Sequence, residues 1–120
     1  MLSNKLSIRP TLELSSKNPN EDFQNKTLRP ILKLQNSILL SVFLQQHPKF
    51  EIGNVNENLI FEKVQNALRK NVALKNKMIG MVIGLCTDEE LEIYQQNESE
   101  YNKRIIGMLT QRLADNINEK

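Results

Sequence analysis

The sequence predicts an all-α fold, an antiparallel bundle of three or four helices with an extended N-terminal arm. The first observation is residues 27–47, TLRPILKLQNSILLSVFLQQH, a stretch too apolar for a helix that lies on a surface. The second is the helical spacing of apolar residues after residue 56. The third is composition, because the chain has no Trp and few Gly or Pro after residue 53, unlike sheet proteins rich in turns.

Residues 1–19 are expected to form an extended or flexible arm. Between residues 5 and 15, apolar side chains fall on alternate positions, which is the period of a strand. A single strand without a partner cannot form a sheet, so this segment is either flexible or extended on a neighbouring surface. Residues 15–20, SSKNPN, have the composition of a linker, and the helical domain is expected at 20–117.

The central helix is predicted at residues 27–47. Thr27 can cap it, which places Pro30 in the first turn, where backbone N–H groups have no helical acceptor. A start at Asn20 with a kink at Pro30 is the alternative. The helix should end at His47, because the residue before a proline disfavours helical geometry. One broad arc should face the core: Leu28, Ile31, Leu32, Ile38, Leu39, Val42 and Phe43.

Three leucines of this helix, Leu34, Leu40 and Leu44, lie outside the core-facing arc. A helix that is apolar on more than one side needs cover on more than one side, from other helices or from a second copy of the chain. We expect a homodimer that buries these three leucines, with another protein as the alternative partner.

The second half of the chain is predicted to hold the remaining helices. Apolar residues recur at helical spacing from residue 60 to residue 82, either as one helix or as two helices with a break at Asn71, and residues 84–87 form the next turn. Thr87 and Glu90 have the spacing of a capping box. The last helix should run to about residue 116, with an inner stripe of Leu91, Tyr94, Tyr101, Ile105, Leu109 and Leu113.

Charge predicts that the last two long segments pair in antiparallel fashion. Residues 69–77 are basic without an acid, and residues 88–100 are acidic without a base. Folding the chain back at 85–87 brings Lys75 beside Glu98. We expect the basic run to be half of an internal charge match, which would set register more than stability.

Five polar side chains interrupt the inward stripes at about the same height: Gln35, Asn71, Lys75, Glu98 and Asn102. Such groups are expensive to bury alone, so they should bond one another or line a wet pocket. Two interpretations stay open, a polar layer that fixes helix register and a small pocket in which Lys75 and Glu98 hold a ligand. Either one predicts that Glu98→Ala destabilises the protein more than Glu100→Ala.

Gly80 and Gly84 form a Gly-x-x-x-Gly pattern. Each glycine inside a helix costs about 1 kcal/mol relative to Ala, so one interpretation is that the pair is kept for close approach to the helix that carries Gly107. The alternative is that Gly84 is only a helix stop.

Side chains and motifs that carry catalysis are scarce. Cys86 and His47 are the only residues of their kinds, and we expect Cys86 to be a buried hydrophobe and His47 a partner of the last helix carbonyls. The sequence has no phosphate loop, nucleophile elbow, dinucleotide fingerprint or metal-spaced ligand set. We therefore expect no enzyme activity, no cofactor and no metal.

Charge and hydropathy bear on location and partners. The formal net charge of +2 gives no ground for a nucleic-acid or membrane partner. There is no signal-peptide core and no apolar run long enough to span a bilayer, and one cysteine fits a reducing compartment, so the cytoplasm is expected. A helix-turn-helix with Lys103 and Arg104 exposed is conceivable, but six acids precede Lys103, which disfavours phosphate contact.

Five blocks resemble a family of short bacterial helical proteins, some of which are labelled glyoxalase. The blocks are FQNKTLRPILKLQN (23–36), GMVIG (80–84), TDEELEIY (87–94), NKR (102–104) and LTQRL (109–113). The resemblance covers about residues 20–114 and implies no established activity. Glyoxalase chemistry is not expected, because it needs His and Glu metal ligands or a histidine cluster and this chain has one His. The leading function is a non-enzymatic interaction or structural module, with small-molecule binding at the polar layer as the alternative.

Overall fold

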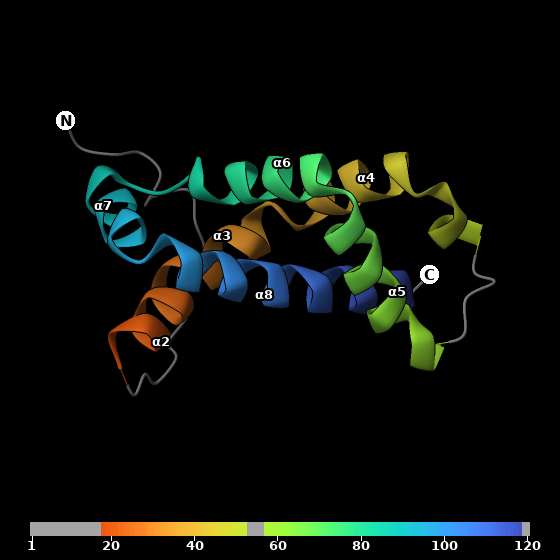
Figure 1. Ribbon diagram of the computed structural model, residues 1–120, viewed down its shortest axis with the longest axis horizontal. Coiled ribbons are helices and arrows are strands. Elements are labelled where there is room, and N and C mark those ends of the chain that lie inside the picture. Colours follow the sequence, from red (N-terminus) through yellow and green to blue (C-terminus); the bar gives the residue numbers. More distant parts are fainter. Residues whose placement is uncertain (1–17, 53–56, 119–120) are drawn as a thin grey trace.

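The computed structural model describes residues 18–52 and 57–118, and within these ranges the chain is helical and has no strand (Figure 1). The predicted all-α class is therefore confirmed. The predicted arm at 1–19 lies outside the described residues except for Asn18 and Pro19, which already start a helix. The elements are α2 (Pro19–Phe23), η1 (Gln24–Leu28), α3 (Arg29–Leu34), α4 (Asn36–Gln46), η2 (Pro48–Ile52), α5 (Glu57–Lys70), α6 (Val72–Ile83), α7 (Asp88–Gln96) and α8 (Glu98–Asn118).

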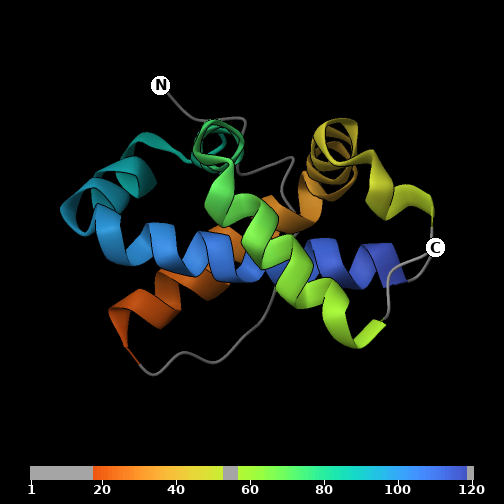
Figure 2. The same cartoon turned by 45° about the vertical axis from the view of Figure 1, so that its right-hand side comes forward.

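The helices pack as crossing layers. α4 and α6 run in opposite directions, contact each other, and both contact α8 below them (Figures 1 and 2). α5 lies across α8, as Figure 2 shows most clearly, and this crossing is one of the main contacts of the fold. The short helix α7 turns the chain from α6 into α8 (Figure 1). The crossing of α5 over α8 leaves a recess beside α6, in which the candidate site lies.

The first helical segment begins earlier than residue 27. Asn18 caps it by accepting a hydrogen bond from the Glu21 N–H at 2.8 Å, and Pro19 occupies the first turn. The chain then passes through the π-helical turn η1 immediately before Pro30. A proline inside a helix clashes with the carbonyl four residues earlier, and a wider turn relieves that clash. The alternative start at Asn20 is thus closer to the observed first residue, Pro19, than the predicted start at Thr27.

Thr27 is not a helix cap. It is buried within η1, and its hydroxyl donates a hydrogen bond of 2.9 Å to Glu90 Oε2 on α7. The predicted cap at Thr27 was wrong because the helix continues through it. The threonine instead ties the first helical segment to α7.

Gln35 breaks the central helix between α3 and α4, with φ −89° and ψ 4°. This irregular residue changes the phase of the helix, so the buried face of α4 does not continue that of α3. Ile38, predicted to face the core, is 52% exposed, and Leu44, predicted to lie outside it, is only 7% exposed. Leu28, Ile31, Leu32, Leu39 and Phe43 are buried as predicted.

Local caps in the second half match the sequence patterns. Asn71 separates α5 from α6 and caps α6 by accepting the Leu74 N–H at 3.1 Å. Thr87 and Glu90 form both hydrogen bonds of the capping box. The last helix, however, is broken at Asn97, whose φ of −147° and ψ of 51° separate α7 from α8. Asn97 and Glu100 have capping-box spacing themselves, so a sequence signal for this break existed.

One hydrophobic core extends through the whole described chain, from Phe23 to Ile117. Cys86, Tyr94 and Tyr101 are buried in it, as expected. The ring centroids of Tyr101 and Phe23 are 4.5 Å apart. The inner stripe predicted for the last helices is likewise buried, except for Leu91, which is half-buried. The core thus holds α7 and α8 against the first helical segment despite the break at Asn97.

Candidate functional site

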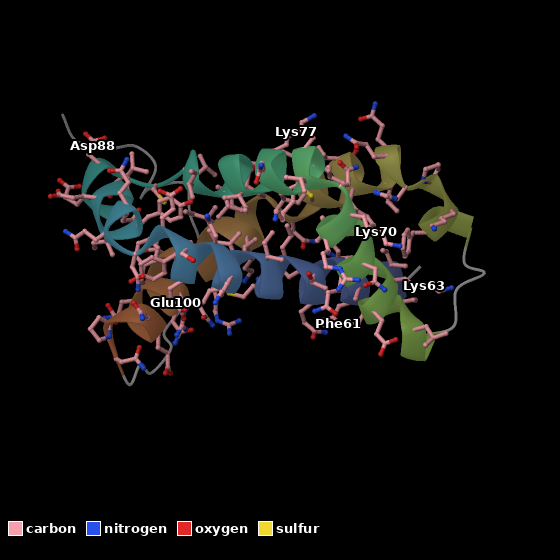
Figure 3. All side chains as sticks on the ribbon, viewed as in Figure 1. Phe61, Lys63, Lys70, Lys77, Asp88 and Glu100 are labelled. Carbon is pink, nitrogen blue, oxygen red and sulfur yellow. The ribbon has the colours of Figure 1, made fainter. Side chains whose placement is uncertain are left out.

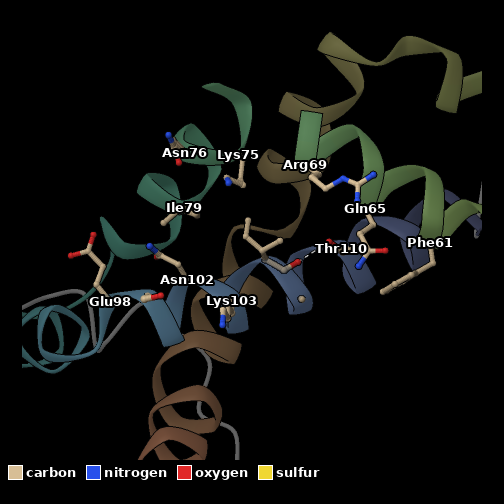
Figure 4. Close-up of a pocket in the computed structure, with 13 residues that line it drawn as sticks. Phe61, Gln65, Arg69, Lys75, Asn76, Ile79, Glu98, Asn102, Lys103 and Thr110 are labelled. Carbon is tan, nitrogen blue, oxygen red and sulfur yellow. Dashed lines mark hydrogen bonds between the residues drawn. The ribbon is translucent and has the colours of Figure 1, made fainter. Parts of the chain in front are cut away.

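A hollow of about 780 Å³ lies between α5, α6 and α8 (Figure 4), and we call it the α5–α6–α8 groove. This volume is typical of small-molecule sites. Thirteen residues line the groove: Phe61, Gln65, Arg69, Lys75, Asn76, Ile79, Glu98, Ser99, Asn102, Lys103, Ile106, Gly107 and Thr110. The α5 residues among them are four apart, so one face of α5 closes one end, and α8 forms the floor (Figure 4).

The groove combines an apolar wall with an excess of positive charge. Phe61, Ile79 and Ile106 provide the apolar surface. Among the described residues, the charged side chains of the lining are the cations Arg69, Lys75 and Lys103 and one carboxylate, Glu98. Figure 4 places Glu98 at one end and Arg69 toward the other, with Lys75 and Lys103 between them. None of the three cations forms an ion pair with a described carboxylate. The lining therefore favours an anion with an apolar part.

Asn102 is a positioned polar group in the floor of the groove. Its Oδ1 accepts a hydrogen bond of 2.5 Å from the Tyr94 hydroxyl, which leaves its amide N–H groups as donors. Burial raises the pKa of Tyr94, and the negative charge of Glu98 raises it further, although the bond to Asn102 opposes this. Tyr94 therefore stays a neutral donor at physiological pH and holds the Asn102 amide in place.

The structure brings three of the five predicted polar residues together. Lys75, Glu98 and Asn102 line the groove, whereas Gln35 and Asn71 do not. Gln35 donates from Nε2 to the Met81 carbonyl at 3.4 Å, and Asn71 donates from Nδ2 to Gln46 Oε1 at 3.0 Å. The five side chains therefore do not form one layer, because the breaks at Gln35 and Asn71 put those two residues at helix ends.

Glu98 is exposed, and the expectation that it is buried was wrong. The break at Asn97 makes Glu98 the first residue of α8, where a carboxylate interacts favourably with the positive end of the helix dipole. The predicted match between Lys75 and Glu98 does not form an ion pair. Ion pairs between described side chains join Lys26 to Asp22 at 2.9 Å and Arg104 to Glu100 at 3.1 Å, each within four residues.

Sequence reasoning missed most of the groove. Arg69 and Lys103 were assigned to other roles, and Gln65, Asn76 and Thr110 were not singled out. The only available signal was the spacing of Phe61, Gln65 and Arg69 along one face of α5. That spacing does not reveal which helix the face meets. The groove exists because α5 crosses α8, which is a tertiary feature.

The three leucines proposed for a dimer interface differ in exposure. Leu44 is buried by its own chain, and Leu40 is half-buried against the core. Leu34 alone is exposed, at 37%, close to the exposed Ile38. A second copy is therefore not needed to cover Leu44, and the exposed apolar surface at this point consists of Leu34 and Ile38.

The glycines do not mediate close helix contact. Outside its own helix backbone, a Cβ at Gly80 or at Gly107 would meet no atom of a described residue within 4 Å, so neither glycine is needed for close packing against those residues. Gly84 is the C-cap of α6, and a Cβ there would lie 3.1 Å from the Gly80 carbonyl oxygen. Gly84 thus ends the helix, and the close-approach interpretation was wrong.

His47 and Arg104 have structural partners. The His47 ring stacks on Phe43 with 5.1 Å between centroids and packs edge-on against Phe50 at 6.3 Å. Its buried Nε2 has no hydrogen-bond partner among the described residues. Besides its ion pair, Arg104 donates from Nη1 to Gln24 Oε1 at 2.9 Å. Both side chains are half-buried and contact other parts of the fold. The expectation that the His47 side chain bonds the last carbonyls of its helix was wrong, because its ring packs on aromatic side chains instead.

Two further features of the described residues bear on the site. No three His, Cys, Asp or Glu residues are grouped so that they could hold a metal ion there. None of the described helices combines the length and apolar character that a bilayer crossing requires. In the comparisons with known proteins, no family model, curated protein or solved structure matches the chain.

Proposed function

We propose that this protein is a non-enzymatic binding module, whose α5–α6–α8 groove takes an organic anion with an apolar part. The observation that carries the proposal is the groove lining, in which three cations unpaired with described carboxylates accompany one carboxylate and an apolar wall. An anion there would gain charge-assisted hydrogen bonds, and its apolar part would leave water against Phe61, Ile79 and Ile106. The proposal adopts the pocket interpretation with an enlarged set of residues.

Binding rather than catalysis fits the hydroxyl groups of the lining. Thr110 donates its hydroxyl hydrogen to the Ile106 carbonyl of its own helix at 2.7 Å. Ser99 is exposed on the first turn of α8, and the lining includes no histidine that would act as its base. The groups that remain available are cationic or amide donors, which suit recognition of an anion.

Calorimetric titration with decanoate tests the proposal. Lys75→Gln should weaken decanoate binding by about tenfold, since a charge-assisted hydrogen bond is worth about 1.4 kcal/mol or more. Lys77→Gln is the matched control, because Lys77 is exposed on the same helix and points away from α8 (Figure 3). Hexanoate should bind at least about tenfold more weakly than decanoate, because it buries fewer methylene groups. Equal losses in the two lysine variants, or no binding, would contradict the proposal.

We also propose that the chain self-associates through Leu34 and Ile38. These two side chains are 37% and 52% exposed and lie four residues apart beside the break at Gln35. Burial of both on a second copy would remove apolar surface from water on each partner. Light scattering coupled to size exclusion should give twice the monomer mass, and Ile38→Glu should give the monomer. A monomer mass for the unmodified protein at high concentration would refute self-association.

A further inference from the structure

A second, more polar hollow of about 460 Å³ lies on the other flank of α8, and we call it the α3–α8 hollow. Its polar lining comes from α3, from the start of α4 and from the last turns of α8. The side chains used below are Arg29, Asn36, Gln111, Arg112, Asp115 and Asn116. Gly107 is part of the lining of both hollows, so they lie on either side of the same helix.

Two arginines from distant parts of the chain, Arg29 and Arg112, face this hollow, and both are half-buried. Burial lowers the pKa of the Arg112 guanidinium, and the positive charge of Arg29 lowers it further, while Asp115 opposes the shift. Two like charges that are partly removed from water repel each other more strongly than in solvent. The fold therefore keeps a repulsive pair in place.

The charges of this pair are not neutralised by a direct ion pair in the described part of the chain. Neither arginine forms one with a described carboxylate. Asp115, the one carboxylate among the described residues of the lining, accepts a hydrogen bond from Gln111 Nε2 at 2.9 Å. Arg29 uses Nε to bond Asn25 Oδ1 at 2.9 Å, which leaves its terminal nitrogens, and Arg112 has no hydrogen bond to a described residue. Guanidinium donors therefore remain available at the hollow.

A reciprocal amide pair also lines the hollow. Asn116 Nδ2 donates to Asn36 Oδ1 at 2.9 Å, and Asn36 Nδ2 donates to Asn116 Oδ1 at 3.4 Å. This pair joins α4 to α8 at the edge of the hollow. Each amide has a second N–H, which adds neutral donors beside the two guanidinium groups.

We infer that the α3–α8 hollow binds a compact oxyanion, the phosphate group of inorganic phosphate or of a small phosphate monoester, between Arg29 and Arg112. Paired guanidinium groups match the geometry of phosphate oxygens and bind them with charge-assisted hydrogen bonds. A doubly charged anion would also relieve the repulsion between the two arginines. This inference does not rest on the groove ligand proposed above, because it uses different side chains on the opposite flank of α8.

Phosphate titration at constant ionic strength, with chloride as the balancing anion, tests this site. Chemical shifts of the arginine Nε–H groups and calorimetry give the affinity. Arg112→Gln should weaken phosphate binding by about tenfold or more, and Arg69→Gln, which removes an arginine from the α5–α6–α8 groove, should leave it unchanged. If Arg112→Gln does not fold, Arg29→Gln carries the same expectation.

The outcomes separate the possible sources and the two proposals. Glycerol 3-phosphate that binds more tightly than inorganic phosphate would identify a monoester site, and equal affinity would identify a site for the oxyanion alone. No saturable effect beyond chloride, or an equal effect in Arg112→Gln and Arg69→Gln, would overturn the inference. If the unmodified protein binds phosphate but does not bind decanoate, only the ligand proposed for the α5–α6–α8 groove is contradicted.

Discussion

Gly107→Ala should stabilise the protein, which tests directly whether the exposed face of α8 is open. Gly107 lies in the interior of α8, and a Cβ there would meet no atom within 4 Å in the described part of the chain, apart from the backbone of α8 itself. Glycine in a helix interior is less favourable than alanine by about 0.8–1 kcal/mol, chiefly because the unfolded chain loses more backbone entropy. With no contact to oppose that gain, the free energy of unfolding should rise by about that amount and Tm by about 4 °C.

Urea denaturation followed by circular dichroism measures the change in free energy. Gly84→Ala is the matched control, because its Cβ would lie 3.1 Å from the Gly80 carbonyl oxygen at the end of α6. The control should gain less stability than Gly107→Ala or lose stability. Destabilisation by Gly107→Ala would contradict an open face of α8. It would mean that another part of the chain or a second copy covers both hollows beside Gly107.

Three further predictions follow from single contacts. Thr87→Ala should lower the free energy of unfolding by about 1–2 kcal/mol, because it removes the hydroxyl oxygen that accepts the Glu90 N–H. A smaller loss in urea denaturation would show that the capping box contributes little. Burial, and then the charge of Lys49, lowers the pKa of His47 below 6.5. The neutral His47 should therefore contribute its full share of the free energy of unfolding above pH 6.5 and lose it as the pH falls below that value. His47→Gln should flatten this part of the profile of Tm against pH. Glu100→Ala should lower the free energy of unfolding by about 0.5 kcal/mol more than Glu98→Ala, which reverses the order that the sequence predicted for a buried Glu98. Both carboxylates lie in the first turn of α8, but only Glu100 pairs with Arg104, and equal midpoints in urea would argue against that ion pair.

The predictions that succeeded depended on local chemistry. Thr87 caps α7 as predicted, through a bond to the residue three positions ahead, and a sequence pattern of that length specifies such a cap. Asn71 lies at the break expected there, but its role as the cap of α6 was not predicted. The buried positions of the first helical segment followed in the same way from helical spacing, up to Gln35. The all-α class needed only these local signals together with the composition.

The predictions that failed depended on contacts between distant residues or on a cap that was overlooked. Nothing in the residues around Gln35 indicates a break, and its side chain bonds the Met81 carbonyl of another helix. The resulting change of phase reversed the expected exposure of Ile38 and Leu44. Asn97 has the spacing of a capping box with Glu100, but the apolar stripe that continues from Tyr94 to Tyr101 led to the prediction of one unbroken helix.

The candidate site could be predicted only in part for the same reason. Lys75, Glu98 and Asn102 were identified as polar residues on apolar stripes, and all three line the α5–α6–α8 groove. Their partners Arg69 and Phe61 lie on α5, and no local pattern shows that α5 crosses α8. Arg29 and Arg112 face one hollow from α3 and α8, which only the tertiary fold reveals.

Mapping of backbone amide chemical shifts during titration with decanoate tests the central proposal most directly. We expect saturable shifts that are confined to the facing surfaces of α5, α6 and α8, centred on Lys75 and Asn102, and reduced in Lys75→Gln. Shifts that are absent, that spread over the whole core, or that centre on another surface would contradict an anion site in this groove.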